Sequence, residues 1–232
     1  MSYQITANRL PLPFRLGSVN CYILKSETGC LLIDTGGSNQ RAQLVKQLES
    51  AGCYPGRLKL IVLTHGDFDH TGNAAYLREK FGAKIAMHAG DAGMLERGDM
   101  SWNRKKSRFI LGKVVPILFG FGKSERCKPD YDLEDGDALA EFGFDARVIA
   151  LPGHSSGSIG ILASAGGPSI GSDQAMFCGD LLDNTRQPAL NAIMDDLQAA
   201  KASLQKLKSL AIHTIYPGHG APFAANLMPS VS

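Results

Sequence analysis

The sequence predicts a globular protein of the mixed α/β class, and three observations support this prediction. Short apolar runs typical of strands alternate with amphipathic segments typical of helices. The chain has 232 residues, of which 44% are hydrophobic and 20% charged, as in an ordinary domain with a sizeable core. No internal repeat, low-complexity tract or linker is visible, so we expect residues 1–232 to form a single domain.

The first half of the chain is expected to form a hairpin followed by alternating helices and strands. Two apolar runs within residues 21–36 flank a polar turn, which predicts the hairpin. Residues 39–52 carry spaced apolar side chains and end in glycine, the pattern of a surface helix. Apolar runs then predict strands at 58–64 and 83–89, separated by a helix at 73–82.

The second half is expected to be mostly β-structure with one long helix. Strands are predicted within residues 139–153, 158–164 and 175–182. Residues 196–210 have apolar side chains three and four positions apart, which predicts an amphipathic helix. A last short strand and turn are expected at 211–220.

Residues 97–128 differ in charge from the rest of the chain. They contain nine Lys or Arg and two acidic residues, so the segment carries +7 and the remaining 200 residues carry −5. The segment also contains Trp102, Phe109, Phe119 and Phe121. We expect an insertion or lid that offers cations and an apolar wall to an anionic or acylated small molecule, or that forms a homodimer contact. A solvated helix and loop is the plainer alternative.

Composition argues against several other classes of protein. A net charge of +2 does not point to nucleic acid or to a membrane surface. The five cysteines never form a CxxC pair, so neither a disulfide framework nor a thiolate zinc site is expected. The N-terminus lacks the pattern of a signal peptide, and no apolar run approaches the ~20 residues that a membrane-spanning helix needs. We expect a cytoplasmic protein that acts on a small molecule, without a nucleic-acid or membrane partner.

Ionisable side chains follow five apolar runs, at the points where the strands should end. These side chains are Asp34, His65, Asp67, Asp69, His70, His154, Asp180 and His219. Loops at strand ends allow a rigid sheet to direct side chains at a common point. Imidazole and carboxylate groups without cysteine suit divalent zinc, manganese or iron.

Two other interpretations of these segments are weaker. The segment from Asp67 begins like an EF-hand calcium loop, but its twelfth position is Arg78, where a bidentate Glu is required. GHSSG at 153–157 matches the G-x-S-x-G motif of serine hydrolases, with Asp180 and His219 following in the appropriate order. That motif needs a helix after its serine, whereas the residues that follow are glycine-rich and β-like. A serine hydrolase therefore stays a minor alternative.

Five ordered segments resemble the motifs of the metallo-β-lactamase superfamily. They are LLIDTG, THGDFDHTGN, LPGHSSGSIG, FCGDLL and YPGHG, of which the second is similar to T-H-x-H-x-D-H-x-G. The resemblance covers about residues 18–222. It implies an αββα sandwich with metal ions at one edge of two β-sheets, and it is much less specific for the substrate.

The resemblance also implies a dinuclear metal centre. It implies that the first ion is held by His65, the residue at position 67 and His154. It implies that the second ion is held by Asp69, His70 and His219, with Asp180 between the two ions. Asp34 and Thr64 match residues that support ligand histidines through hydrogen bonds. Two divalent ions are expected, zinc before manganese or iron.

The chain departs from the motif at position 67, where Asp67 replaces a histidine. A third carboxylate leaves the cluster with one positive charge fewer, so we expect water bound there to be less acidic. An oxygen ligand in place of nitrogen is expected to shift the preference from zinc toward manganese or iron. Because Asp is shorter than His, binding through water and partial occupancy of this site are both open.

The function implied by the resemblance is that of a metal-dependent hydrolase. A metal-bridging hydroxide is expected to attack an ester, lactone, thioester or amide, while Asp69 transfers the proton to the leaving group. The main alternative is an oxidoreductase similar to the flavodiiron proteins, which carry Glu at the position of Asp67 and bind iron. Those proteins continue into a flavodoxin-like domain, whereas this chain ends shortly after His219. Hydrolysis is therefore the preferred interpretation.

Three further residues with reactive side chains are expected to be structural. His88 and His213 are interpreted as ordinary packed or surface histidines. Cys178 lies two positions before Asp180, so on a regular strand it would face the same side as that carboxylate.

Overall fold

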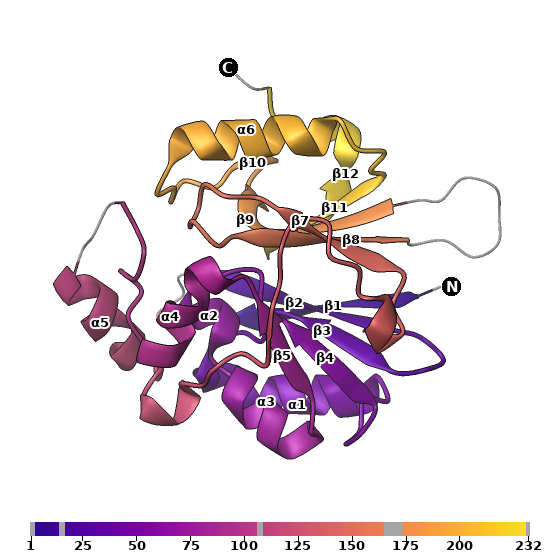
Figure 1. Cartoon of the computed structure of the whole chain (residues 1–232), viewed down its shortest axis with the longest axis vertical. Coiled ribbons are helices and arrows are strands. Elements are labelled where there is room, and N and C mark those ends of the chain that lie inside the picture. The colour runs from indigo at the N-terminus through magenta and orange to yellow at the C-terminus, as the bar shows by residue number, and fades with distance from the viewer. Residues whose placement is uncertain (1–2, 14–16, 106–108, 165–173, 231–232) are drawn as a thin grey trace.

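The protein is described by a computed structural model that covers residues 3–13, 17–105, 109–164 and 174–230. Two β-sheets pack face to face, and helices cover the outer face of each sheet (Figure 1). This arrangement confirms the αββα sandwich. Among the described residues, no helix is both long and apolar enough to cross a bilayer.

The first sheet contains six strands in the same order in space as in the chain. They are β1 (Gln4–Pro11), β2 (Ser18–Lys25), β3 (Cys30–Ile33), β4 (Leu58–Val62), β5 (Lys84–Met87) and β6 (Tyr131–Asp132). β1 to β3 are antiparallel, and β3 to β6 are parallel. Parallel neighbours require a crossover connection, and helices supply it here.

Helices follow the parallel strands of this sheet. They are α1 (Arg41–Ser50), α2 (Phe68–Thr71), α3 (Ala74–Phe81), α4 (Ala89–Arg97) and α5 (Phe109–Leu118). In Figure 1, α1 and α3 lie beneath the sheet, whereas α2, α4 and α5 gather at one end of it. Two short 3₁₀ turns complete this half, η2 (Ser38–Gln40) and η3 (Lys123–Glu125).

The second sheet runs in the order β12-β11-β9-β8-β7, with β10 paired to β9. Its strands are β7 (Ala146–Ala150), β8 (Ile159–Ser164), β9 (Gln174–Asn184), β10 (Ala189–Leu190), β11 (Thr214–Gly220) and β12 (Phe223–Ala224). Helix α6 (Leu197–Lys208) covers its outer face (Figure 1). The 3₁₀ turn η4 (Ala140–Phe142) precedes β7, and the 3₁₀ turn η5 (Ala225–Leu227) follows β12.

The core follows from strands that are apolar on both faces. On β2, Cys21 and Ile23 pack against the helices of the first sheet, while Tyr22 and Leu24 pack between the sheets. A third apolar cluster lies between the second sheet and α6. Strands buried on both faces appear in the sequence as continuous apolar runs, which explains why they could be recognised.

The predicted hairpin and the later strands and helices are present, while several further elements were not predicted, among them β1, α4 and the short elements α2, β6, β10 and β12. Strand β1 is an edge strand in which only two of eight residues are buried, so it lacks an apolar run. Helix α4 contains two glycines, which lower helix propensity. The hairpin closes with a hydrogen bond from Ser26 N to Gly29 O of 2.9 Å.

The basic segment 97–128 is integrated into the fold. It contains the end of α4, all of α5 and η3, while residues 106–108 lie outside the described residues. Phe121 and Cys127 are buried in the core cluster on the helical side of the first sheet. The last part of the segment is therefore core structure rather than a lid resting on the surface.

Candidate metal centre

Both sheets direct ligand-type side chains toward the same edge. His65 to His70 follow β4, His154 follows β7, Asp180 lies on β9 and His219 lies on β11. Two groups of potential ligand atoms form among the described residues, each with all of its atoms within 4.8 Å of one another. The first group is His65, His154 and Asp180, and the second is Asp69, His70 and His219. Six of the seven predicted residues thus fall into the two predicted clusters.

Asp180 connects the two groups. Its Oδ1 lies 3.4 Å from His70 Nε2, and its Oδ2 lies 3.3 Å from His219 Nε2, while the residue itself belongs to the first group. Asn191 Nδ2 donates a hydrogen bond of 3.2 Å to Asp180 Oδ2. A Cβ at Gly218 would lie 2.1 Å from Asp180 Oδ1, so only glycine fits beside this carboxylate.

All four histidines are held through Nδ1, which leaves Nε2 for the centre. The contacts are His65 Nδ1 to Thr64 Oγ1 at 2.9 Å, His70 Nδ1 to Asp34 Oδ2 at 2.9 Å, His154 Nδ1 to Ile193 O at 2.6 Å and His219 Nδ1 to Ser18 O at 2.8 Å. Carbonyl and carboxylate oxygens only accept hydrogen bonds, so Nδ1 carries a hydrogen. Metal-binding histidines in proteins are oriented in this way.

Asp34 occupies the expected supporting position beneath two of these histidines. Its Oδ1 accepts a hydrogen bond from Thr64 N, and its Oδ2 accepts one from Thr64 Oγ1, each at 2.8 Å. Because the Thr64 hydroxyl donates to Asp34, its oxygen is free to accept from His65 Nδ1. The φ of Asp34 is 59°, a left-handed conformation that is uncommon outside glycine, and it follows directly after β3.

The site fits a divalent cation because two of its buried ligand atoms lack a hydrogen-bond partner within the described part of the chain. Among the described residues, His65 Nε2 and Asp180 Oδ1 are buried and accept or donate no hydrogen bond. An unpaired buried polar group is costly, and a coordinated ion would satisfy both atoms. Imidazole nitrogens and carboxylate oxygens are the donors that zinc and similar ions take in proteins.

Carboxylates around the second group raise the pKa values of its two histidines. Burial lowers the pKa of His70, but Asp180, Asp34 and Asp69 together outweigh burial and raise this pKa to about 10. Burial also lowers the pKa of His219, but the nearby carboxylates, chiefly Asp180, outweigh burial and raise this pKa to about 9. In the first group, burial and the neighbouring histidines hold the pKa of His65 well below its ordinary value.

Asp67 is the predicted ligand that falls outside both groups. Its Oδ2 lies 2.8 Å from His154 Nε2 and 3.7 Å from His65 Nε2, so this oxygen is directed at the first group. Its Oδ1 accepts a hydrogen bond of 2.6 Å from Nη2 of Arg104, whose side chain is 13% exposed. Sequence reasoning missed Arg104, and the only available signal was its place in the basic segment.

A buried carboxylate, Asp91, holds the loops on both sides of the first group. It accepts hydrogen bonds from Gly66 N at 3.0 Å, from Gly157 N at 2.8 Å and from the Ser155 hydroxyl. Ser155 is the serine of GHSSG, and its hydroxyl is also 2.7 Å from that of Ser158. It is engaged in structural hydrogen bonds, and no helix follows it, which argues against a serine nucleophile.

His88, His213 and Cys178 have structural roles, but the predicted orientation of Cys178 is wrong. His88 caps α4 by accepting a hydrogen bond of 2.9 Å from Gly90 N, and His213 is hydrogen-bonded to Thr214. Cys178 does not face the same side as Asp180, as a regular strand would require, because it packs in the cluster beneath α6. Gly179 between them has a φ of 51°, which breaks the alternation of the strand.

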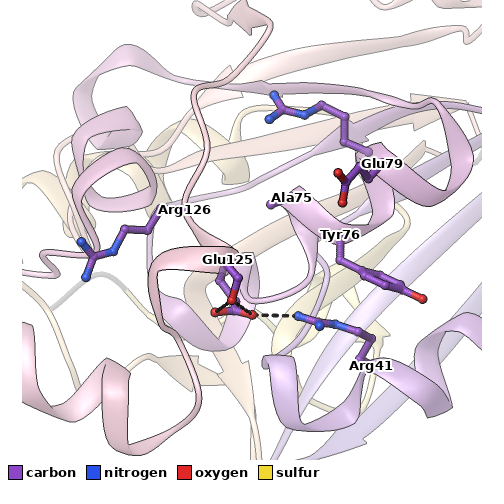
Figure 2. Close-up of a pocket in the computed structure, with 8 residues that line it drawn as sticks. Arg41, Ala75, Tyr76, Glu79, Glu125 and Arg126 are labelled. Carbon is purple, nitrogen blue, oxygen red and sulfur yellow. Dashed lines mark hydrogen bonds and ion pairs between the residues drawn. The ribbon is translucent and has the colours of Figure 1, made fainter.

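Figure 2 shows a separate pocket that contains none of these residues. It has a volume of about 340 Å³ and is lined by side chains from α1, α3 and η3. Arg41 Nη2 lies 3.0 Å from Glu125 Oε1, and the Arg41 guanidinium also lies over the ring of Tyr76. Among the described residues, this pocket contains no cluster of three or more metal-ligand side chains, whereas the centre between the sheets contains two such clusters.

The chain is similar to proteins that hydrolyse acyl compounds. It is 27% identical over 176 residues to the hydroxyacylglutathione hydrolase GloC of Haemophilus influenzae, a match that covers 74% of this chain and 70% of that protein. It is 26% identical over 215 residues to the atrochrysone carboxyl ACP thioesterase of Aspergillus fumigatus. That match covers 91% of this chain and 53% of the thioesterase, so this chain spans about half the length of that relative.

Solved structures and a family model agree with the fold. A metallo-β-lactamase family protein from Thermus thermophilus superposes with a TM-score of 0.68 at 25% identity, covering 96% of this chain and 76% of that one. The model of the metallo-β-lactamase superfamily matches residues 14–219, a range that contains every predicted ligand. The chain therefore belongs to the metallo-β-lactamase superfamily, whose members include metal-dependent hydrolases.

Proposed function

We propose that this protein is a metal-dependent hydrolase that cleaves an acyl ester or thioester of a small molecule. One observation carries the proposal: four buried or half-buried histidines present Nε2 to two adjacent groups of ligand atoms, and Asp180 links these groups. We propose that the site binds two divalent metal ions, with zinc preferred. The first ion would be held by His65, Asp67, His154 and Asp180, and the second by Asp69, His70, Asp180 and His219.

The residues around the two groups define the chemistry. When bound, divalent ions supply an activated water and polarise a substrate carbonyl. Asp69 Oδ2 lies 3.6 Å from His219 Nε2, and its side chain is 16% exposed, so the carboxylate is at the mouth of the site. We assign to Asp69 the transfer of a proton from the attacking water to the leaving group, which is general acid–base catalysis. No protein nucleophile is required.

Apolar side chains on both flanks of the centre favour an acyl substrate. On one flank, Phe68 packs against Phe119 at the end of α5, with ring centroids 5.1 Å apart. Leu118 beside it is 70% exposed. On the other flank, Ile193 holds His154 through its carbonyl while its own side chain is 67% exposed. Large exposed apolar side chains on both sides of a polar site are typical of a binding surface. The names of the two relatives above support the same class.

The test is hydrolysis measured with metal-free and zinc-loaded protein on a panel of thioesters, esters, lactones and β-lactams. We expect acyl thioesters or esters to be cleaved, the activity to disappear with a chelator and to return with zinc alone. Activity with zinc alone would also exclude a di-iron oxidoreductase. Activity that resists chelation, or zinc-loaded protein inactive on the whole panel, would contradict the proposal.

The acyl preference has its own test in Ile193→Ser, which keeps the carbonyl that orients His154. We expect KM to rise for long-chain acyl substrates and to stay unchanged for acetyl substrates. Leu227→Ser is the matched control, because Leu227 is 57% exposed but lies on η5. An equal effect of both variants, or of Ile193→Ser on acetyl substrates, would contradict the assignment of this flank.

A further inference from the structure

The side chain of Asp67 is divided between two partners. Oδ2 faces the first group, at 2.8 Å from His154 Nε2, while Oδ1 accepts the 2.6 Å hydrogen bond from Arg104 Nη2. An aspartate has only two oxygens, so the guanidinium prevents Asp67 from using both of them on one ion. Only one oxygen of Asp67 therefore remains available to the first group, just as a histidine at this position would offer one nitrogen.

The charge of Arg104 also changes the balance at this site. When only the carboxylates are counted, Asp67 makes the metal site one unit less positive than a histidine at the same position would. The guanidinium is permanently charged and restores that charge within hydrogen-bonding distance of the carboxylate. Both side chains are mostly buried, at 13% and 19% exposed, so water screens the interaction poorly. The charge count from the sequence was incomplete because it omitted this residue.

The backbone around Arg104 is fixed on both sides. Asn103 Nδ2 donates to Ser156 Oγ at 2.8 Å and to Gly90 O at 3.1 Å, and the residue has the left-handed φ of 53° that asparagine tolerates. Lys105 N donates to Asp195 Oδ2 at 2.8 Å, and its ammonium contacts Asp196 at the start of α6. The loop is therefore attached to α4, to the connection between β7 and β8 and to the segment before α6, and Arg104 is held in a defined position.

We propose that Arg104 is a positioning residue of the first metal site, which directs one oxygen of Asp67 at the ion and compensates its charge. The proposal rests on the proposed metal-binding function of this site. Together, Asp67 and Arg104 replace the neutral histidine of the family motif. The pair keeps the net charge of a site with histidine at position 67, so the loss of acidity expected for water bound there is offset.

The test is a double-mutant cycle on zinc binding, with metal-free protein titrated in competition with a chromophoric chelator. His65→Ala first identifies which binding step belongs to the first site. Asp67→His leaves Arg104 facing a cation without its carboxylate, so we expect first-site affinity to fall ~10- to 100-fold. Asp67→His combined with Arg104→Gln removes the unpaired charge, and we expect affinity to return to within about threefold of the wild type.

Arg104→Lys separates charge from shape, since lysine keeps the charge without the planar fork. We expect it to retain zinc affinity better than Arg104→Gln. Circular dichroism confirms folding, and Asp67→Asn serves as a second neutral replacement if Asp67→His does not fold.

A residue that only anchors the loop would give additive losses, with the double variant weaker than either single variant. That result, or an Asp67→His variant with wild-type zinc affinity, would overturn the proposal. Because the readout is metal binding, a failure to find hydrolytic activity would contradict the proposed function while leaving this cycle interpretable.

Discussion

The two groups of ligand atoms differ in how they are supported. The second group is formed by Asp69, His70 and His219, whose anchors are a carboxylate next to β3 and a backbone carbonyl of β2. The first group depends in addition on Asp67 and on a cation from a loop that follows α4. Rigid sheet edges are sufficient for the second group, whereas the first also requires a long-range ion pair.

Asp180 is common to both groups, so its loss should have the largest effect. We expect Asp180→Ala to abolish tight zinc binding at both sites and to reduce hydrolysis to background, because each ion loses a charged ligand. Elemental analysis after dialysis against buffered zinc measures this. If Asp180→Ala lost only one ion, the two groups would be independent and the linking role assigned to Asp180 would be wrong.

The pH dependence of zinc binding should differ between the groups. At neutral pH, His70 and His219 are protonated in the metal-free protein, since their pKa values are raised to about 10 and about 9. Binding there must displace two protons, so affinity should fall about tenfold per pH unit for each histidine as the pH decreases below 9.

In the first group, burial and the neighbouring histidines hold the pKa of His65 well below its ordinary value, and burial opposes the rise that Asp67 causes in the pKa of His154, so we expect fewer protons to be displaced there than in the second group. Calorimetric titration in two buffers of different ionisation enthalpy measures the protons released at each step. Release of equal numbers of protons at the two binding steps would contradict the predicted difference between the groups.

The support from Asp34 can be removed without removing a ligand. Asp34→Asn cannot accept hydrogen bonds through both side-chain atoms, so we expect zinc affinity of the second group to fall ~10- to 100-fold. Competition titration measures this affinity. Asp135→Asn is the matched control, because Asp135 is 53% exposed and pairs with Lys206, and it should leave zinc binding unchanged.

The smallest effect on catalysis is expected at Ser155. Ser155→Ala removes buried hydrogen bonds to Asp91 and Ser158, so stability should fall by about 1–2 kcal/mol. Activity of the zinc-loaded variant should remain within about threefold of the wild type, because the serine acts through Asp91 on loop position only. Activity reduced to background would instead support the serine-hydrolase alternative.

The ligand positions could be predicted because each one follows a recognisable apolar run in the sequence. Parallel and antiparallel strands that end at one edge bring such residues together, and the order of motifs matched a known family. The family match also indicated that Asp34 and Thr64 support histidines, which their hydrogen bonds are consistent with.

Contacts between distant segments could not be predicted in this way. Arg104 reaches Asp67 from the loop after α4, Asp91 on α4 holds the loops beside the first group, and no local pattern marks either residue. The orientation of Cys178 was mispredicted because one left-handed glycine interrupts β9. Local periodicity therefore located the ligands, while the long-range partners that tune them required the fold.

The most direct test of the two-group centre is the zinc content of wild-type protein, His65→Ala and His70→Ala after dialysis against buffered zinc. Two adjacent groups predict about two ions per chain in the wild type and about one in each variant. Fewer than about one ion per chain in the wild type, or a zinc content that neither substitution changes, would contradict the account.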